Sequence, residues 1–105
     1  MRFAIVLAPA AATALQRLPA RIRSEVRDAL ERHLRFEPTK TSKSRIKRLR
    51  GMQQPQFRLR VNDIRVFYDV TENAVEVLAI IEKAEAQTWL DREATPDEGG
   101  TTREG

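Results

Sequence analysis

The sequence predicts an α+β domain in the order β-α-α-β-β-β. An N-terminal helical hairpin would pack on a small, mostly antiparallel sheet, and a short C-terminal helix would follow. Two observations lead to this expectation: a strand pattern at residues 2–8 precedes two helical patterns that meet at Pro19, and three strand patterns follow one another within residues 56–82. Such a strand meander needs a helical layer over its apolar face.

The N-terminal segment supplies the first strand and both helices. Residues 2–8 are apolar at nearly every position, which suits a strand buried on both faces. The proline that follows can open a helix over residues 9–18, and Pro19 ends it. A second helix is expected over residues 20–36, because its apolar side chains recur at helical spacing until Pro38 stops it.

The next segment is polar and strongly basic. Within residues 39–50 only Ile46 and Leu49 can anchor the chain to a core, so we expect a loop or one short helix that ends at Gly51. Residues 53–55 are expected to be a connector.

Residues 56–69 form the predicted β-hairpin around which the sheet is organised. Apolar and polar residues alternate, and residues 62–63 are Asn-Asp, which tolerate positive φ in a two-residue loop. This loop places Arg60 opposite Arg65, with Arg58 on the same side and a wholly apolar opposite face.

The last strand is expected over residues 74–82. With a four-residue turn before it, Ile81 would join the apolar face and Ile80 would lie beside Arg65. The same register sets Asp69 opposite Glu76, which is a second pair of like charges.

The C-terminal helix is expected over residues 84–94, with Trp89 and Leu90 as its packing residues. The predicted domain therefore spans residues 1–94. Residues 95–105 have the composition of a disordered tail.

Composition restricts the possible functions. The chain has 105 residues and no cysteine, which excludes disulfides and thiolate metal sites and suits a reducing cytoplasm. No apolar run reaches membrane-spanning length, and there is no glycine-rich phosphate loop. The net charge is +4, and the segment from Lys40 to Arg65 holds nine basic residues against one acid, Asp63. We therefore expect a cytoplasmic protein without metal or cofactor, whose partner is a nucleic acid or an acidic protein segment.

The arginine pair in the hairpin is the main functional clue. Like charges directly opposite each other destabilise a strand pair, so Arg60 and Arg65 beside Arg58 predict a bound anion. The alternative is that the arginine stems lie along the sheet with their heads in water, or that a nearby carboxylate neutralises them. Phe67 would face these arginines and could stack on a base, unless it is buried under the C-terminal helix.

Three segments resemble the RelE/ParE superfamily of bacterial type II toxins. They read IKRLRGM at residues 46–52, FRLRVNDIRVFYDV at residues 57–70 and VEVLAIIEKAEAQTWL at residues 75–90. The resemblance implies a small basic toxin that a cognate antitoxin wraps and neutralises. RelE-like members enter the ribosomal A site and cut mRNA, whereas ParE-like members share the fold and inhibit DNA gyrase.

The resemblance also suggests site residues. Arg58 matches a basic sheet position of RelE-like ribonucleases, Arg65 their arginine after the hairpin turn, and Lys83 the lysine that ends the last strand, so these are the candidate catalytic residues. Ala84 and Leu90 stand where those enzymes place an arginine and a tyrosine. Further basic residues of the connector and hairpin are the candidate RNA-binding set: Arg45, Lys47, Arg48, Arg50 and Arg60.

RNA cleavage by a 2′-hydroxyl needs a base and an acid as well as cations, and arginine supplies only the cations. His33 is expected on a helix surface and Tyr68 in the core. Lys83 would serve as a base only with a lowered pKa. Glu82 is the remaining candidate near the arginines, with an ordinary ion pair as its alternative role.

Three functions stay open at this point. The first is a RelE-like toxin that inhibits translation by ribosome-dependent mRNA cleavage or by blocking the A site, with the ribosome, mRNA and an acidic segment of the antitoxin as partners. The second is a ParE-like gyrase inhibitor. The third is an inactive toxin-fold protein that only binds its antitoxin.

Overall fold

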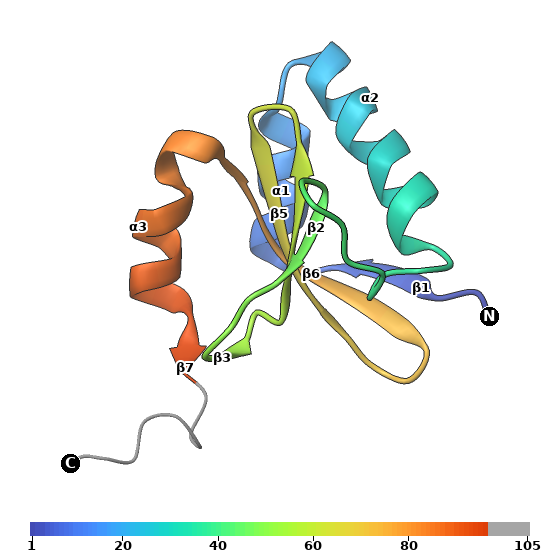
Figure 1. Ribbon diagram of the computed structural model, residues 1–105. Helices are drawn as coiled ribbons and strands as arrows, with labels where there is room; N and C mark the ends of the chain where they lie inside the picture. Colours follow the sequence, from blue (N-terminus) through green and yellow to red (C-terminus); the bar gives the residue numbers. More distant parts are fainter. Residues whose placement is uncertain (97–105) are drawn as a thin grey trace.

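The computed structural model describes residues 1–96, in which helices cover both faces of one sheet (Figure 1). The elements in chain order are β1 (Ala4–Leu7), α1 (Pro9–Arg17), α2 (Ala20–Ala29), the π-helical segment η1 (Leu30–Leu34), β2 (Ile46–Arg48), β3 (Met52–Gln54), β4 (Phe57–Val61), β5 (Ile64–Val70), β6 (Ala74–Glu82), α3 (Lys83–Glu93) and β7 (Thr95–Pro96). The predicted α+β class, helical hairpin, meander and C-terminal helix are confirmed.

The main sheet has the strand order β1-β6-β5-β4-β2. Strand β1 runs parallel to β6, and the other pairs are antiparallel. Helices α1 and α2 lie on one side of this sheet, and α3 lies on the other (Figure 1). The two faces of the central hairpin therefore have different roles, because one builds the main core and the other carries the charged side chains.

The hairpin register is confirmed. Residues pair as predicted, with Arg60 opposite Arg65 and Val61 opposite Ile64. Asn62 takes a φ of 54° in the loop, the left-handed conformation that asparagine tolerates better than most residues. The local turn chemistry thus sets which hairpin side chains share a face.

The prediction of which face each side chain of β6 occupies is wrong for the second half of the strand. The pairing with β5 shifts between Phe67 and Tyr68, so that one residue of β6 is extra, as in a β-bulge. Ile80 consequently lies opposite Val66 in the core, and Ile81 lies opposite Arg65, the reverse of the expectation. An extra residue reverses every later side chain, because side chains alternate with a period of two.

The basic segment also differs from the prediction. Instead of a loop or short helix, it contains the edge strand β2, which pairs antiparallel with β4. Ile46 is buried opposite Leu59, and Lys47 lies opposite Arg58. The Ser42 hydroxyl accepts hydrogen bonds from backbone N–H groups three and four residues later, including that of Ile46 at 3.3 Å. A three-residue strand has too little periodicity to be recognised without its neighbour.

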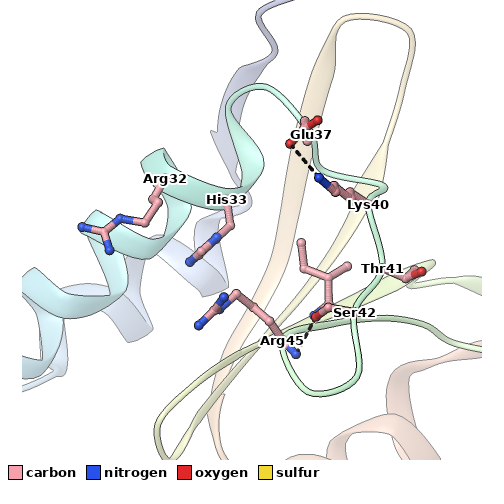
Figure 2. A pocket seen from close by; sticks show the side chains of 8 residues that line it. Arg32, His33, Glu37, Lys40, Thr41, Ser42 and Arg45 are labelled. Atoms are coloured by element: carbon pink, nitrogen blue, oxygen red, sulfur yellow. Dashed lines mark hydrogen bonds and ion pairs between the residues drawn. The ribbon is translucent and has the colours of Figure 1, made fainter.

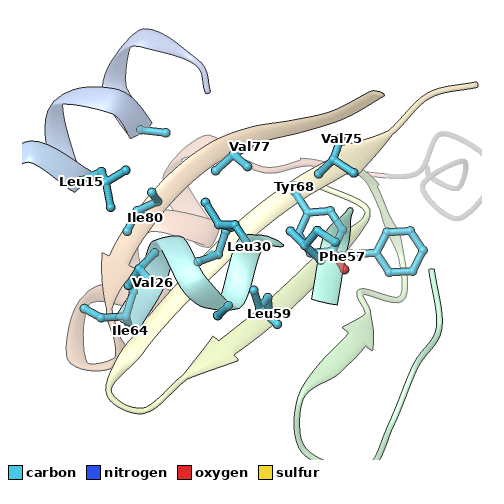
Figure 3. Packing of buried hydrophobic residues seen from close by; sticks show 14 of the residues in the cluster. Leu15, Val26, Leu30, Phe57, Leu59, Ile64, Tyr68, Val75, Val77 and Ile80 are labelled. Atoms are coloured by element: carbon cyan, nitrogen blue, oxygen red, sulfur yellow. The ribbon is translucent and has the colours of Figure 1, made fainter. Parts of the chain in front are cut away.

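The main core lies between the helical hairpin and the sheet (Figure 3). Tyr68 is fully buried there, as predicted; its ring stacks on Phe57 with centroids 5.5 Å apart, and its hydroxyl donates to the Pro38 carbonyl oxygen at 2.6 Å. The other large, fully buried side chains of this core are Leu34, Leu59, Val26, Val66, Val75 and Val77.

A second, two-stranded sheet joins β3 to β7. Asp69 is buried beside it and accepts hydrogen bonds from the Gln54 side chain and the Gln56 backbone N–H, both at 2.8 Å. The first two residues of the predicted tail, Thr95 and Pro96, form β7, and the rest of that tail lies outside the described residues. No helix among the described residues is long and apolar enough to cross a membrane.

Candidate functional site

Four cations from three adjacent strands share the sheet face opposite the main core. Arg58 and Arg60 alternate on β4, Arg65 lies opposite Arg60 on β5, and Lys47 lies opposite Arg58 on β2. Direct cross-strand partners point to the same face, so these side chains form one group. We call it the arginine face, defined by Lys47, Arg58, Arg60 and Arg65.

The arginine face lacks a balancing carboxylate within residues 1–96. None of its four side chains forms an ion pair there, since the ion pairs of this region link neighbours on α2, on the loop after η1 and on α3. Arg65 instead donates to the carbonyl oxygens of Asn62 at 2.8 Å and Ile64 at 3.2 Å, and Arg58 donates to that of Ser44 at 3.3 Å. Arg58 and Arg65 are thus held by backbone carbonyl oxygens rather than by opposite charge.

Arg58 is the most constrained member. Its Nε is buried and has no hydrogen-bond partner. Burial first, and then the neighbouring Arg65 and Arg60 guanidiniums, lower the pKa of Arg58 from its ordinary value. Arginine stays protonated in proteins, so Arg58 keeps its charge beside two other guanidiniums. The repulsion between these positive charges is unfavourable, and a bound anion would reduce it.

The aromatic residue of this face is covered. Phe67 is 1% exposed, and its ring stacks on Trp89 of α3 with centroids 5.0 Å apart. Burial under the C-terminal helix, which was one of the two interpretations of Phe67, is therefore correct, and the ring is not presented for stacking on a base. Trp89 is confirmed as a packing residue of α3.

Lys83 lies at the hairpin tip. It is the first residue of α3, its side chain is exposed, and its backbone N–H donates to the Asp63 carbonyl oxygen at 2.7 Å. Glu82, the residue before it, pairs with Ile64 at the same end of the sheet.

The other proton-transfer candidates lie away from the arginine face. Tyr68 points into the core, and burial raises its pKa well above the ordinary value. Glu82 lies opposite Ile64 on the core side of the bulged strand, so its expected position near the arginines is wrong. Residues 1–96 also contain no cluster of three or more His, Asp or Glu side chains able to hold a metal ion. The arrangement can bind and stabilise negative charge.

The remaining predicted RNA-binding residues are not on the arginine face. Arg48 lies over the Phe57 ring, with its Cζ 5.4 Å from the centroid, and donates to the Gln56 carbonyl oxygen at 2.8 Å. Arg50 is exposed in the turn before β3. Arg45 precedes β2 and points toward His33 (Figure 2).

Arg45 belongs to a second basic site, which sequence reasoning missed. A groove between the end of the α2–η1 helix and the segment before β2 is lined by Arg32, His33, Glu37, Lys40, Thr41, Ser42, Arg45 and Ile46 (Figure 2). We call it the His33 groove. His33 is partly buried there, and burial, followed by the charges of Arg45 and Arg32, lowers its pKa. No local sequence signal links His33 to Arg45, because the contact depends on where β2 docks.

Solved structures with the same fold come from toxin–antitoxin complexes. The RelBE2 complex from Mycobacterium tuberculosis matches with a TM-score of 0.63 and 23% identity, covering 78% of this chain and 99% of that one. The RelE–RelB complex of Pyrococcus horikoshii OT3 matches with a TM-score of 0.57 and 28% identity, covering 79% and 97%. The RelB–RelE complex of Methanococcus jannaschii matches with a TM-score of 0.60 and 16% identity, covering 80% and 96%.

Sequence comparison identifies the family. No curated protein sequence matches this chain. A family model described as "ParE toxin of type II toxin-antitoxin system, parDE" matches residues 5–87, which include every strand of the main sheet and both helices of the hairpin. The chain therefore belongs to the ParE toxin family of type II toxin–antitoxin systems, within the RelE/ParE superfamily.

Proposed function

We propose that this toxin inhibits translation by binding RNA on the ribosome through its arginine face, and that it blocks the A site. One observation carries the proposal: Arg58, Arg60 and Arg65 crowd one sheet face without an ion pair in residues 1–96, and the buried Nε of Arg58 has no partner. A phosphate group would supply the missing negative charge. Charge-assisted hydrogen bonds from arginine to phosphate are among the stronger polar contacts.

Blocking requires less of the site than cleavage does. A cutting enzyme needs a base to take the 2′-hydroxyl proton and an acid to protonate the leaving oxygen. Tyr68 and Glu82 lie on the core side of the sheet, and Lys83, at its hairpin end, is exposed. We therefore propose blocking first and mRNA cleavage second. In the cleavage alternative, the catalytic residues would be Arg58, Arg65 and Lys83.

The partners follow from the same chemistry. The solved neighbours are complexes of RelE with RelB, and by analogy we propose a cognate antitoxin with an acidic segment that crosses the arginine face. The ribosomal target places the toxin in the cytoplasm. The toxin domain is proposed to span residues 1–94.

Pulse labelling after induced expression tests this function. Protein synthesis should stop before DNA or RNA synthesis, and primer extension should find intact mRNA on the arrested ribosomes. Arg58→Gln should relieve the arrest, whereas Arg17→Gln, which removes an exposed arginine at the end of α1, should not. Continued protein synthesis in growth-arrested cells would refute the proposal, and cut mRNA would replace blocking by cleavage.

Gyrase inhibition is the second candidate, and membership of the ParE toxin family favours it. It would act through a protein interface and needs no proton transfer, which agrees with the residues around the arginine face. Purified toxin would then inhibit supercoiling by gyrase in vitro, and DNA synthesis would stop first in labelled cells. Normal growth without the antitoxin would instead indicate a toxin-fold protein that only binds its partner.

A further inference from the structure

We infer that the His33 groove is a second anion site that binds a phosphate group, with Arg45 as its cation and His33 as an additional donor. The inference deepens the proposed function and rests on it, since it gives RNA a contact outside the arginine face. The chemistry recognised is a phosphate, carried either by an RNA backbone or by a small free anion.

The geometry brings three donors into one groove. Arg32 and His33 come from the helix, Arg45 comes from the segment before β2, and their side chains point toward a common space in Figure 2. Arg45 also lines two adjoining hollows that extend to Arg60 and Asn62 at the hairpin. The groove therefore runs on to Arg60, a member of the arginine face, so a single extended polyanion can contact both sites.

The acids that line these hollows already have partners. Asp28 lies 3.1 Å from Arg32, and Glu37 lies 3.8 Å from Lys40. Glu25 accepts a hydrogen bond from the Asn62 side chain at 3.1 Å and lies 3.9 Å from Arg21.

After these pairs are formed, the hollows keep a surplus of positive charge. Arg45 and Arg60 have no carboxylate partner among residues 1–96. The surplus comes from two guanidiniums that line one hollow together with Asn62, so an anion there gains attraction from both.

His33 reports on this surplus charge. Burial and the charges of Arg45 and Arg32 outweigh the opposing charge of Asp28, so the protonated imidazole is disfavoured in the unliganded protein. An anion between these groups would reverse the balance and add an acceptor for a second imidazole N–H. Anion binding and protonation of His33 are then linked, and each favours the other.

The experiment follows the His33 ring signals by NMR as a function of pH. His33 is the one histidine of the chain, so the signals need no assignment by mutation. The purified toxin is titrated alone, with inorganic phosphate, and with a short single-stranded RNA. Both probes should raise the pKa of His33, and a response to RNA at far lower concentration than to phosphate would identify the backbone as the source.

Arg45→Gln is the diagnostic variant. Its backbone role is kept, because Arg45 contributes only its carbonyl oxygen to the hydrogen bond from Arg60. The variant should raise the pKa of His33 in the unliganded protein, remove its response to phosphate, and make the salt dependence of single-stranded RNA binding shallower by about 0.7. Arg17→Gln should change none of these, and amide spectra should show that both variants are folded.

The outcomes separate this inference from the proposed function. An unchanged pKa of His33 with both probes overturns the anion site, even if translation still stops. A response that survives Arg45→Gln also overturns it. A response to the probes in a toxin that leaves translation running overturns only the proposed ribosomal function.

Discussion

Replacing Arg65 by alanine separates a binding role from a structural one. The change removes one guanidinium from the cross-strand pair with Arg60, which should stabilise the hairpin by about 0.2–1 kcal/mol. It also removes the hydrogen bonds to the carbonyl oxygens of Asn62 and Ile64, at 2.8 and 3.2 Å. Each of these would contribute about 0.5–1.5 kcal/mol, and the lower value applies because water can replace an exposed donor.

The opposing terms nearly cancel. We expect the free energy of unfolding of Arg65→Ala to stay within about 1 kcal/mol of the wild-type value, which is small against the roughly 5–15 kcal/mol of a typical domain. Loss of one charged contact to phosphate, by contrast, should weaken RNA binding by about tenfold or more. The salt dependence of log K should become shallower by about 0.7 for a single strand.

Two measurements on the same protein check this reasoning. Urea unfolding gives the stability, and RNA binding at several salt concentrations gives the slope. Arg17→Ala serves as the matched control, because it removes an exposed arginine from α1. An unfolded Arg65→Ala protein would show that the residue supports the hairpin, and an unchanged salt slope would show that Arg65 does not contact phosphate.

Other predictions concern the scaffold of the site. Tyr68→Phe leaves the buried Pro38 carbonyl without its donor and should cost about 1–3 kcal/mol in urea unfolding. Because burial raises the pKa of Tyr68 in the folded state, its contribution is complete below the unfolded pKa near 10 and declines at higher pH, so wild type and Tyr68→Phe should converge in alkali. Trp89→Ala removes the stack on Phe67 and should expose that ring and loosen α3, seen as faster amide exchange in α3 than in β5. Asp69→Ala removes the carboxylate oxygens that accept hydrogen bonds from the Gln54 side chain and the Gln56 backbone N–H, and it should lower the melting temperature by several degrees. An unchanged melting temperature would show that water replaces these oxygens.

The sequence by itself determined the parts whose causes are local. Helix α1 begins with Pro9 at its first turn, and Pro19 separates α1 from α2, because proline suits a first helical turn and breaks a helix interior. The hairpin register follows from a two-residue loop between alternating strands, so the shared face of Arg58, Arg60 and Arg65 could be predicted from neighbouring residues alone.

Only the tertiary structure decided the features that depend on distant partners. The bulge in β6 exchanges Ile80 and Ile81 between faces and moves Glu82 away from the arginines. No residue of β6 indicates the bulge in the sequence. The docking of β2 on β4 likewise carries Arg45 to His33, which lies on a helix twelve residues earlier. Both outcomes depend on how separate elements pack against one another, and that energy is absent from any single stretch of sequence.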